Sequence, residues 1–156
     1  MRQRWLPVGI VALVIFVVNA VFRLISWKGG ITSDEGQTSL SVVGTLVVGV
    51  ALAVAGARWA VRYPFSRVAG DLLLAILVGT VLAVVVGPFV ANSRPMADGL
   101  ESFVAQILLF LAVGFGSALL GFVCMVAVGK DWKSRGLRRY ERIYARKATP
   151  KKPARG

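Results

Sequence analysis

The run LLLAILVGTVLAVVVGPFV extends from Leu72 to Val90 and carries no charged side chain in 19 consecutive positions. From Leu72 to Val86 it is apolar around the whole circumference of a helix, so it has no polar stripe to turn toward water. About 20 residues, at 1.5 Å per residue, cross the hydrocarbon core of a bilayer. We therefore interpret this run as a membrane-spanning helix.

Three further runs have the same character and a length close to or above the one required to cross a bilayer. They cover residues 7–25, 40–57 and 103–128. Over the whole chain, 56% of the residues are hydrophobic and the mean hydropathy is +0.71, which leaves too little polar surface for a water-soluble domain. The predicted fold class is an all-α membrane protein. It has a four-transmembrane-helix bundle in residues 1–129 and a basic amphipathic C-terminal segment in residues 130–156.

The basic residues are unevenly divided between the two sides of the predicted membrane. Most of the lysines and arginines lie before the first run, between the second and third runs, or after the fourth. Only Arg23, Lys28 and Arg94 fall on the other side. Positively charged flanks stay in the cytoplasm, so this bias predicts a multi-pass protein of the cell (inner) membrane with a cytoplasmic N-terminus and a cytoplasmic C-terminus.

The first run has a second interpretation. Two arginines, an apolar stretch and the small-residue sequence Val18-Asn19-Ala20 also resemble a secretory signal with a cleavage site. Cleavage would leave three spans and an amino terminus outside the cell, whereas the carboxyl terminus would stay in the cytoplasm.

Small residues recur at every fourth position in two of the runs. On a helix this spacing forms one smooth ridge, against which another backbone packs closely. The ridge of the second run consists of Ser41, Thr45, Gly49, Ala53 and Ala57, and the ridge of the third run consists of Ala75, Gly79, Ala83 and Gly87. Because a short connection joins these runs, the sequence predicts that they pack ridge to ridge as an antiparallel hairpin.

Few polar side chains fall inside the runs, and we select Asn19, Thr80 and Ser117 as the intramembrane polar candidates. The amide of Asn19 needs hydrogen-bond partners that lipid does not supply, so a neighbouring helix must provide them. These bonds either hold helices together or belong to a polar path that also includes Thr45, Thr80, Gln106 or Ser117.

Arg23 lies near the outer end of the first run. We expect its aliphatic stem to lie along the lipid while its guanidinium reaches the headgroup layer. The alternative is a side chain that faces the bundle and contacts an anion or a lipid headgroup.

The tail combines basic and apolar residues at helical spacing. Leu137, Tyr140 and Tyr144 recur along one side, with Ile143 beside them, so we expect a short helix that lies on the inner leaflet, followed by a disordered end. The residues expected to contact lipid headgroups or a partner are Arg135, Arg138, Arg139, Arg142, Arg146 and Lys147. Since lipid phosphates are already within reach, we expect anionic headgroups or a protein partner rather than nucleic acid.

The sequence offers no catalytic residues, no cofactor-binding motif and no metal site. Histidine is absent, cysteine occurs once, and no carboxylate lies in the central turns of a run. Small multidrug transporters also have four spans, but they rely on an acid in the first span, where this chain offers only Asn19. We predict a non-enzymatic accessory subunit or scaffold with a membrane or cytoplasmic protein partner. The alternative is a small permease or channel that forms a homo-oligomer around a small solute.

Overall fold

The computed structural model describes residues 2–30, 33–93, 96 and 99–148, without the side chains at 2–4, 34 and 145–148. Every element in this described part of the chain is helical, which confirms the all-α class. The predicted disordered end after Ala148 lies outside the described residues. The elements are α1 (Arg2–Lys28), α2 (Asp34–Arg62), α3 (Phe65–Val81), the π-helical turn η1 (Leu82–Val86), α4 (Gly87–Val90), α5 (Gly99–Ala127) and α6 (Trp132–Ala148).

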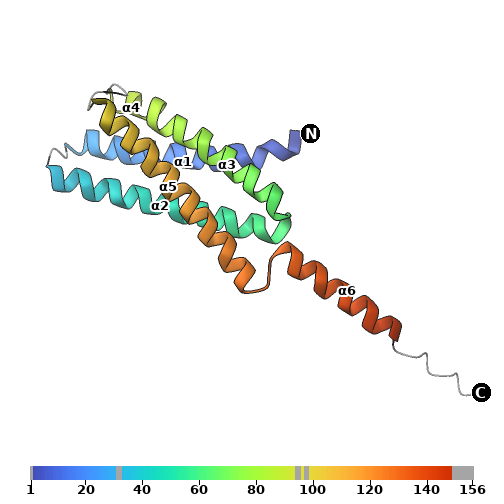
Figure 1. Cartoon of the computed structure of the whole chain (residues 1–156). Helices are drawn as coiled ribbons and strands as arrows, with labels where there is room; N and C mark the ends of the chain where they lie inside the picture. The colour runs from blue at the N-terminus through green and yellow to red at the C-terminus, as the bar shows by residue number, and fades with distance from the viewer. Residues whose placement is uncertain (1, 31–32, 94–95, 97–98, 149–156) are drawn as a thin grey trace, which may run out of the picture.

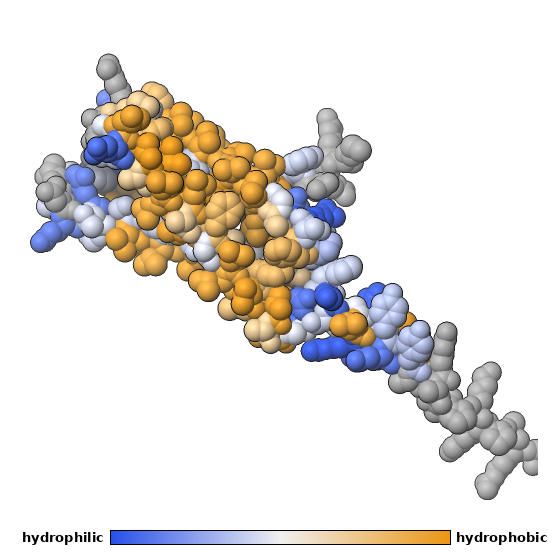
Figure 2. Space-filling view, viewed as in Figure 1, coloured by the Kyte–Doolittle hydropathy of each residue, from blue (hydrophilic) through white to orange (hydrophobic). Residues whose placement is uncertain are grey.

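The four predicted spans are all present as helices long and apolar enough to cross a membrane. They are α1, α2, the continuous segment from α3 to α4, and α5. Figure 2 shows a broad hydrophobic band around the visible face of the bundle, with hydrophilic residues at both ends and along α6. Large apolar side chains such as Leu46 and Leu120 are 63% and 67% exposed within this band. Such a surface suits lipid and not water.

The helices are longer than the apolar runs that predicted them. α2, for example, begins at Asp34 and ends at Arg62, whereas the second run covers residues 40–57. Backbone hydrogen bonds continue into the polar ends, because a carbonyl or amide at headgroup depth still gains from a helical partner. The apolar run therefore marks the hydrocarbon thickness. α1 and α2 extend past their runs on both sides, whereas the third and fourth spans extend only at the start of the helix.

The four long helices form an antiparallel bundle, and the start of α1 lies at the same end as α6 (Figure 1). α2 packs most extensively against α5, whereas α1 packs against both α3 and α2. α2 and α3 contact each other only slightly. The predicted ridge-to-ridge hairpin of the second and third spans is therefore wrong, although the two helices are consecutive and antiparallel.

Glycines explain why α2 prefers α5. A Cβ at Gly121 of α5 would collide with the backbone carbonyl of Ala53, and a Cβ at Gly56 of α2 would collide with the carbonyl of Ala118. A Cβ at Gly49 would lie 2.9 Å from the hydroxyl of Ser117. The two backbones touch where these glycines meet, so this pair approaches more closely than side chains would allow. The ridge of the second span thus faces α5.

The ridge of the third span is buried along its whole length, but it faces α1. Ala75 and Ala83 have no exposed surface, and Gly79 and Gly87 are also buried. A Cβ at Gly79 would lie 3.1 Å from the Cβ of Ile15. Gly49 and Ala53 of the first ridge therefore pack against α5, and the second ridge packs against α1, so neither partner is the predicted one.

The third span contains a π-helical turn where its apolar sequence predicts a regular α-helix. Pro88 has no N–H to donate, and its ring conflicts with the carbonyl four residues earlier. The chain accommodates it in η1, where the N–H of Gly87 donates to the carbonyl of Leu82, five residues back. Such wide turns are frequent at functional sites. Here the turn places Gly87 directly against α1.

Candidate functional site

Arg23 faces the interior of the bundle rather than the lipid. Its Nε donates a hydrogen bond of 2.9 Å to Oδ1 of Asn19, one turn earlier on α1, and its Nη2 donates one of 3.3 Å to Oε1 of Gln106 on α5. The prediction that Arg23 lies along the lipid and reaches the headgroup layer is therefore wrong. The side chain faces the bundle, as the alternative interpretation has it. The two amide oxygens hold the guanidinium plane in a fixed direction.

A cavity of about 230 Å³ adjoins this arginine between α1, α2 and α5. One group of its lining side chains is apolar, including Phe22, Leu109 and Phe110, and the other group is polar. The polar lining consists of Asn19, Arg23, Ser26, Gln37, Ser41, Thr45 and Gln106. On α2 the lining extends from Gln37 to Val48, about 16 Å along the axis at 1.5 Å per residue. The cavity therefore reaches from the helix ends well into the bundle.

α4 supports the arginine from behind. A Cβ at Gly87 would lie 2.9 Å from Oδ1 of Asn19 and 3.3 Å from Nε of Arg23. Glycine at this position lets the hydrogen-bonded pair pack directly against the backbone of α4. Pro88 and Gly87, adjacent in an otherwise apolar run, are the sequence signal from which this arrangement could have been found.

The structure brings together only part of the predicted polar set. Asn19, Thr45 and Gln106 line the cavity. Thr80 is buried in α3 and Ser117 packs against Gly49 of α2, so neither belongs to the cavity lining. Ser26 and Gln37 also line the cavity. The sequence does not predict this, because both lie near helix ends, where polar residues are ordinary. Ser41 also lines the cavity, whereas its spacing in the sequence predicts only a position in a packing ridge.

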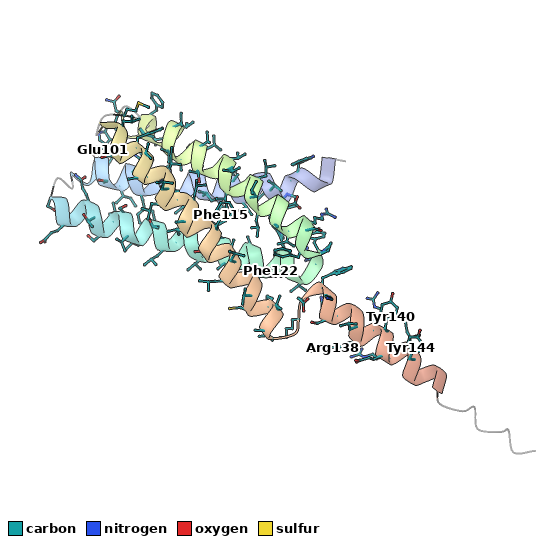
Figure 3. The ribbon with its side chains drawn as sticks, in the orientation of Figure 1. Glu101, Phe115, Phe122, Arg138, Tyr140 and Tyr144 are labelled. Carbon is teal, nitrogen blue, oxygen red and sulfur yellow. The ribbon has the colours of Figure 1, made fainter. Side chains whose placement is uncertain are left out.

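α6 is a second candidate site, at the opposite end of the bundle from the cavity. At about 100° per residue, Arg135, Arg138, Arg139 and Arg142 fall within one arc of roughly 100°. The apolar and aromatic residues occupy the neighbouring arc, and all of them are exposed: Trp132, Leu137, Tyr140, Ile143 and Tyr144. Figure 3 shows Tyr140 and Tyr144 on one side of α6 and Arg138 on the other. Arg146 and Lys147 belong to its last turn, and their side chains lie outside the described residues.

The start of α6 is fixed by the turn that ends α5. Gly129 has a φ of +65°, in the left-handed region, and the N–H of Lys130 donates to the carbonyl of Met125. Asp131 then caps the new helix, because its Oδ2 accepts a hydrogen bond of 3.2 Å from the N–H of Lys133. Four arginines of α6, with Trp132 and Tyr140, line an open pocket of about 790 Å³ that also borders Val61 of α2.

This cap gives a testable prediction. In Asp131→Ala the first turn of α6 loses its acceptor, so we expect the amides of Lys133 and Ser134 to exchange hydrogen about fivefold faster. Asp131→Asn is the matched control, because an asparagine side chain also accepts this bond. The measurement is hydrogen exchange by mass spectrometry on the whole protein. Equal exchange rates in the alanine variant and the wild type would contradict the capping role.

Comparison of the chain with protein families, with curated proteins and with solved structures finds no match. Among the residues that the structure describes, no group of three His, Cys, Asp or Glu side chains could hold a metal ion. The class of protein is therefore defined by the fold and by these two sites alone. It is an all-helical protein in its described part, with four helices long and apolar enough to span a membrane, a polar cavity at one end of its bundle and the arginine-rich helix α6 at the other.

Proposed function

We propose that this protein is a non-enzymatic integral membrane module, an accessory subunit or scaffold, which docks α6 on the anionic headgroups of the cytoplasmic leaflet. Its bundle offers a small-residue and apolar surface to partner helices. Both termini are cytoplasmic in this proposal, and the membrane is the cell (inner) membrane. The observation that carries the proposal is the separation of arginines and exposed aromatic residues onto neighbouring arcs of α6.

The chemistry of α6 supports lipid as its partner. A helix with an arginine arc beside an aromatic arc lies in the plane of the membrane interface, with the rings among the acyl chains and the guanidinium groups on phosphates. Each basic residue near an anionic surface contributes about 1 kcal/mol. The exposed Trp132 and Tyr140 suit the headgroup layer, since each ring has an apolar body and a polar edge.

The packing of α1 supports four spans rather than three. Val8, Ala12 and Ile15 are buried, with Ile15 against Gly79 of α3. Removal of the first span would expose this surface and the ridge of the third span. These contacts favour retention of the first span over cleavage as a secretory signal.

The apolar core favours a scaffold over a permease. Between the cavity and the end of the bundle that carries α6, the interior is filled by fully buried residues such as Leu52, Ile76 and Val68. Solute passage through a single bundle needs a continuous polar or hydrated path. A permease built from this chain would therefore place its path between subunits of a homo-oligomer.

Neutralisation of two arginines tests the lipid docking. In full-length Arg138→Gln/Arg142→Gln, we expect the binding of α6 to discs with 30% phosphatidylglycerol to weaken about 30-fold, because two contributions of about 1 kcal/mol are lost. The measurement is the hydrogen-exchange protection of α6. The matched control is Arg58→Gln/Arg62→Gln, which removes two exposed charges from the same end of the bundle and leaves α6 intact.

We expect the protection of wild-type α6 to fall when salt is raised from 0.1 M to 1 M, as screening shortens the range of attraction from about 10 Å to 3 Å. Equal protection in neutral and anionic discs would contradict the docking. A lone homo-oligomer that carries solute into liposomes would contradict the scaffold and support the permease.

A further inference from the structure

We infer that the cavity beside Arg23 is a binding site for a phosphate group, either of a lipid headgroup or free in solution. The site lies at the end of the bundle opposite α6, so it is separate from the proposed cytoplasmic docking surface. Under the topology proposed above, this end faces outward. The inference does not depend on the docking of α6, and its test uses the arginines of α6 only as a control.

Arg23 is a charged residue within the apolar run of residues 7–25. An arginine within a span costs several kcal/mol in translocon-based scales, and such a residue is a functional-site candidate by default. Arg23 does not reduce this cost by extending along lipid, since it is partly buried and bonded to Asn19 and Gln106. The bundle instead directs the guanidinium to the wall of a cavity.

The wall of the cavity carries several polar side chains. Besides the guanidinium, Ser41, Thr45 and Gln37 line the same space from α2. Hydroxyl and amide groups donate hydrogen bonds to phosphate oxygens, and the positive charge of a guanidinium attracts these oxygens. No carboxylate is among the described residues that line the cavity. The described wall therefore suits an anion.

The cavity has a volume and a position in the bundle that suit a phosphate group. A volume of about 230 Å³ corresponds to roughly eight molecules of liquid water at about 30 Å³ each, which accommodates a phosphate but lies below the usual range for drug-sized ligands. The lining includes Ser26 and Gln37, within the last turn of α1 and the first turn of α2. The cavity is thus open at the depth of the headgroups, where a lipid phosphate can enter with its acyl chains outside.

The backbone of α4 packs against Arg23 at Gly87. Gly87, held in place by the wide turn before Pro88, leaves room for Asn19 and Arg23 against α4. A Cβ there would crowd the hydrogen-bonded atoms of Asn19 and Arg23 and displace the guanidinium from its bonds with the two amides. This arrangement makes Gly87 a positioning residue for Arg23, and it supplies a variant that keeps the charge.

The test uses full-length protein in a phosphate-free maltoside detergent, at constant ionic strength. Inorganic phosphate and short-chain phosphatidylglycerol are titrated separately, and the thermal unfolding midpoint is followed by tryptophan fluorescence. A ligand that binds only the folded state raises this midpoint in a saturable way. We expect Arg23→Gln to weaken the affinity at least about tenfold, since it removes the positive charge from the cavity wall.

Gly87→Ala keeps the charge, so it tests the site even if Arg23→Gln fails to fold. We expect it to weaken binding as well, whereas Arg138→Gln/Arg142→Gln, altered only in α6, should bind like the wild type. Saturation by both probes would support a site open to free phosphate, and saturation by the lipid alone would support a headgroup site. The inference is overturned if neither probe raises the midpoint, or if Gly87→Ala binds both probes like the wild type.

Discussion

Replacement of Gly121 by alanine is expected to lower the free energy of unfolding by about 3 kcal/mol, the upper part of the usual range for overpacking. The new Cβ would meet the backbone carbonyl of Ala53, and a backbone cannot rotate away as a side chain can. α2 and α5 would have to separate along their closest contact, which is the most extensive helix pair of the bundle. The measurement is the midpoint of unfolding in mixed micelles as SDS is added, followed by the fluorescence of the buried Trp59.

Gly116→Ala is the matched control for this prediction. Gly116 lies on the same helix, yet a Cβ there would meet nothing within 4 Å. An alanine at this position is expected to leave the stability unchanged or to raise it by up to about 1 kcal/mol, because glycine is the poorer helix former. Equal midpoints for the two variants would show that α2 and α5 do not touch at Gly121.

A membrane-impermeant maleimide is expected to label the two ends of the bundle from opposite sides. With Cys124 replaced by serine, Lys28→Cys at the end of α1 should react in intact cells, because the proposed topology places it outside. Lys133→Cys in α6 should react only after the cells are permeabilised. Both lysines are exposed, so access is decided by the membrane and not by packing. The expected contrast is nearly all or none.

Both cysteine variants should react equally in detergent, which controls for their intrinsic reactivity. An amino-terminal tag that stays on the intact protein would show that the first span is retained. Labelling of Lys133→Cys in intact cells would refute a cytoplasmic α6, and with it the docking of α6 on the inner leaflet.

The existence of four spans followed from the sequence because the bilayer imposes a length and a composition on each helix separately. The run from Leu72 to Val90 needs no knowledge of its neighbours to be recognised. The ends of the helices were harder to predict, since residues such as Asp34 and Arg62 are polar and still helical. Hydropathy reports where the hydrocarbon ends and not where the hydrogen bonds end.

The pairing of the helices did not follow from the sequence. A ridge of glycine and alanine fits any other smooth surface, so its residues carry no information about which partner they meet. In the structure Gly121 of α5 lies against Ala53 of α2, so the ridge of α2 meets α5 and not α3. Adjacency along the chain favoured the wrong pair.

The cavity was predicted only in part for a related reason. Asn19, Thr45 and Gln106 were recognisable as polar residues inside spans, but they belong to three helices whose relative rotation no single run reveals. Arg23 was assigned to lipid because a long basic side chain near a helix end usually reaches water. Its direction depends on Gln106, which is 83 positions away in the sequence.

The wide turn η1 has a consequence for the ridge of the third span. In a regular α-helix, each step of four residues rotates by about 40°, so the row from Ala75 to Gly87 would wind by about 120° around the axis. A π turn contains an additional residue, and this residue turns the following backbone back by about 100°. Gly79 and Gly87 can therefore both lie against α1. Pro88 thus cancels the winding that would otherwise carry the end of the row out to the lipid.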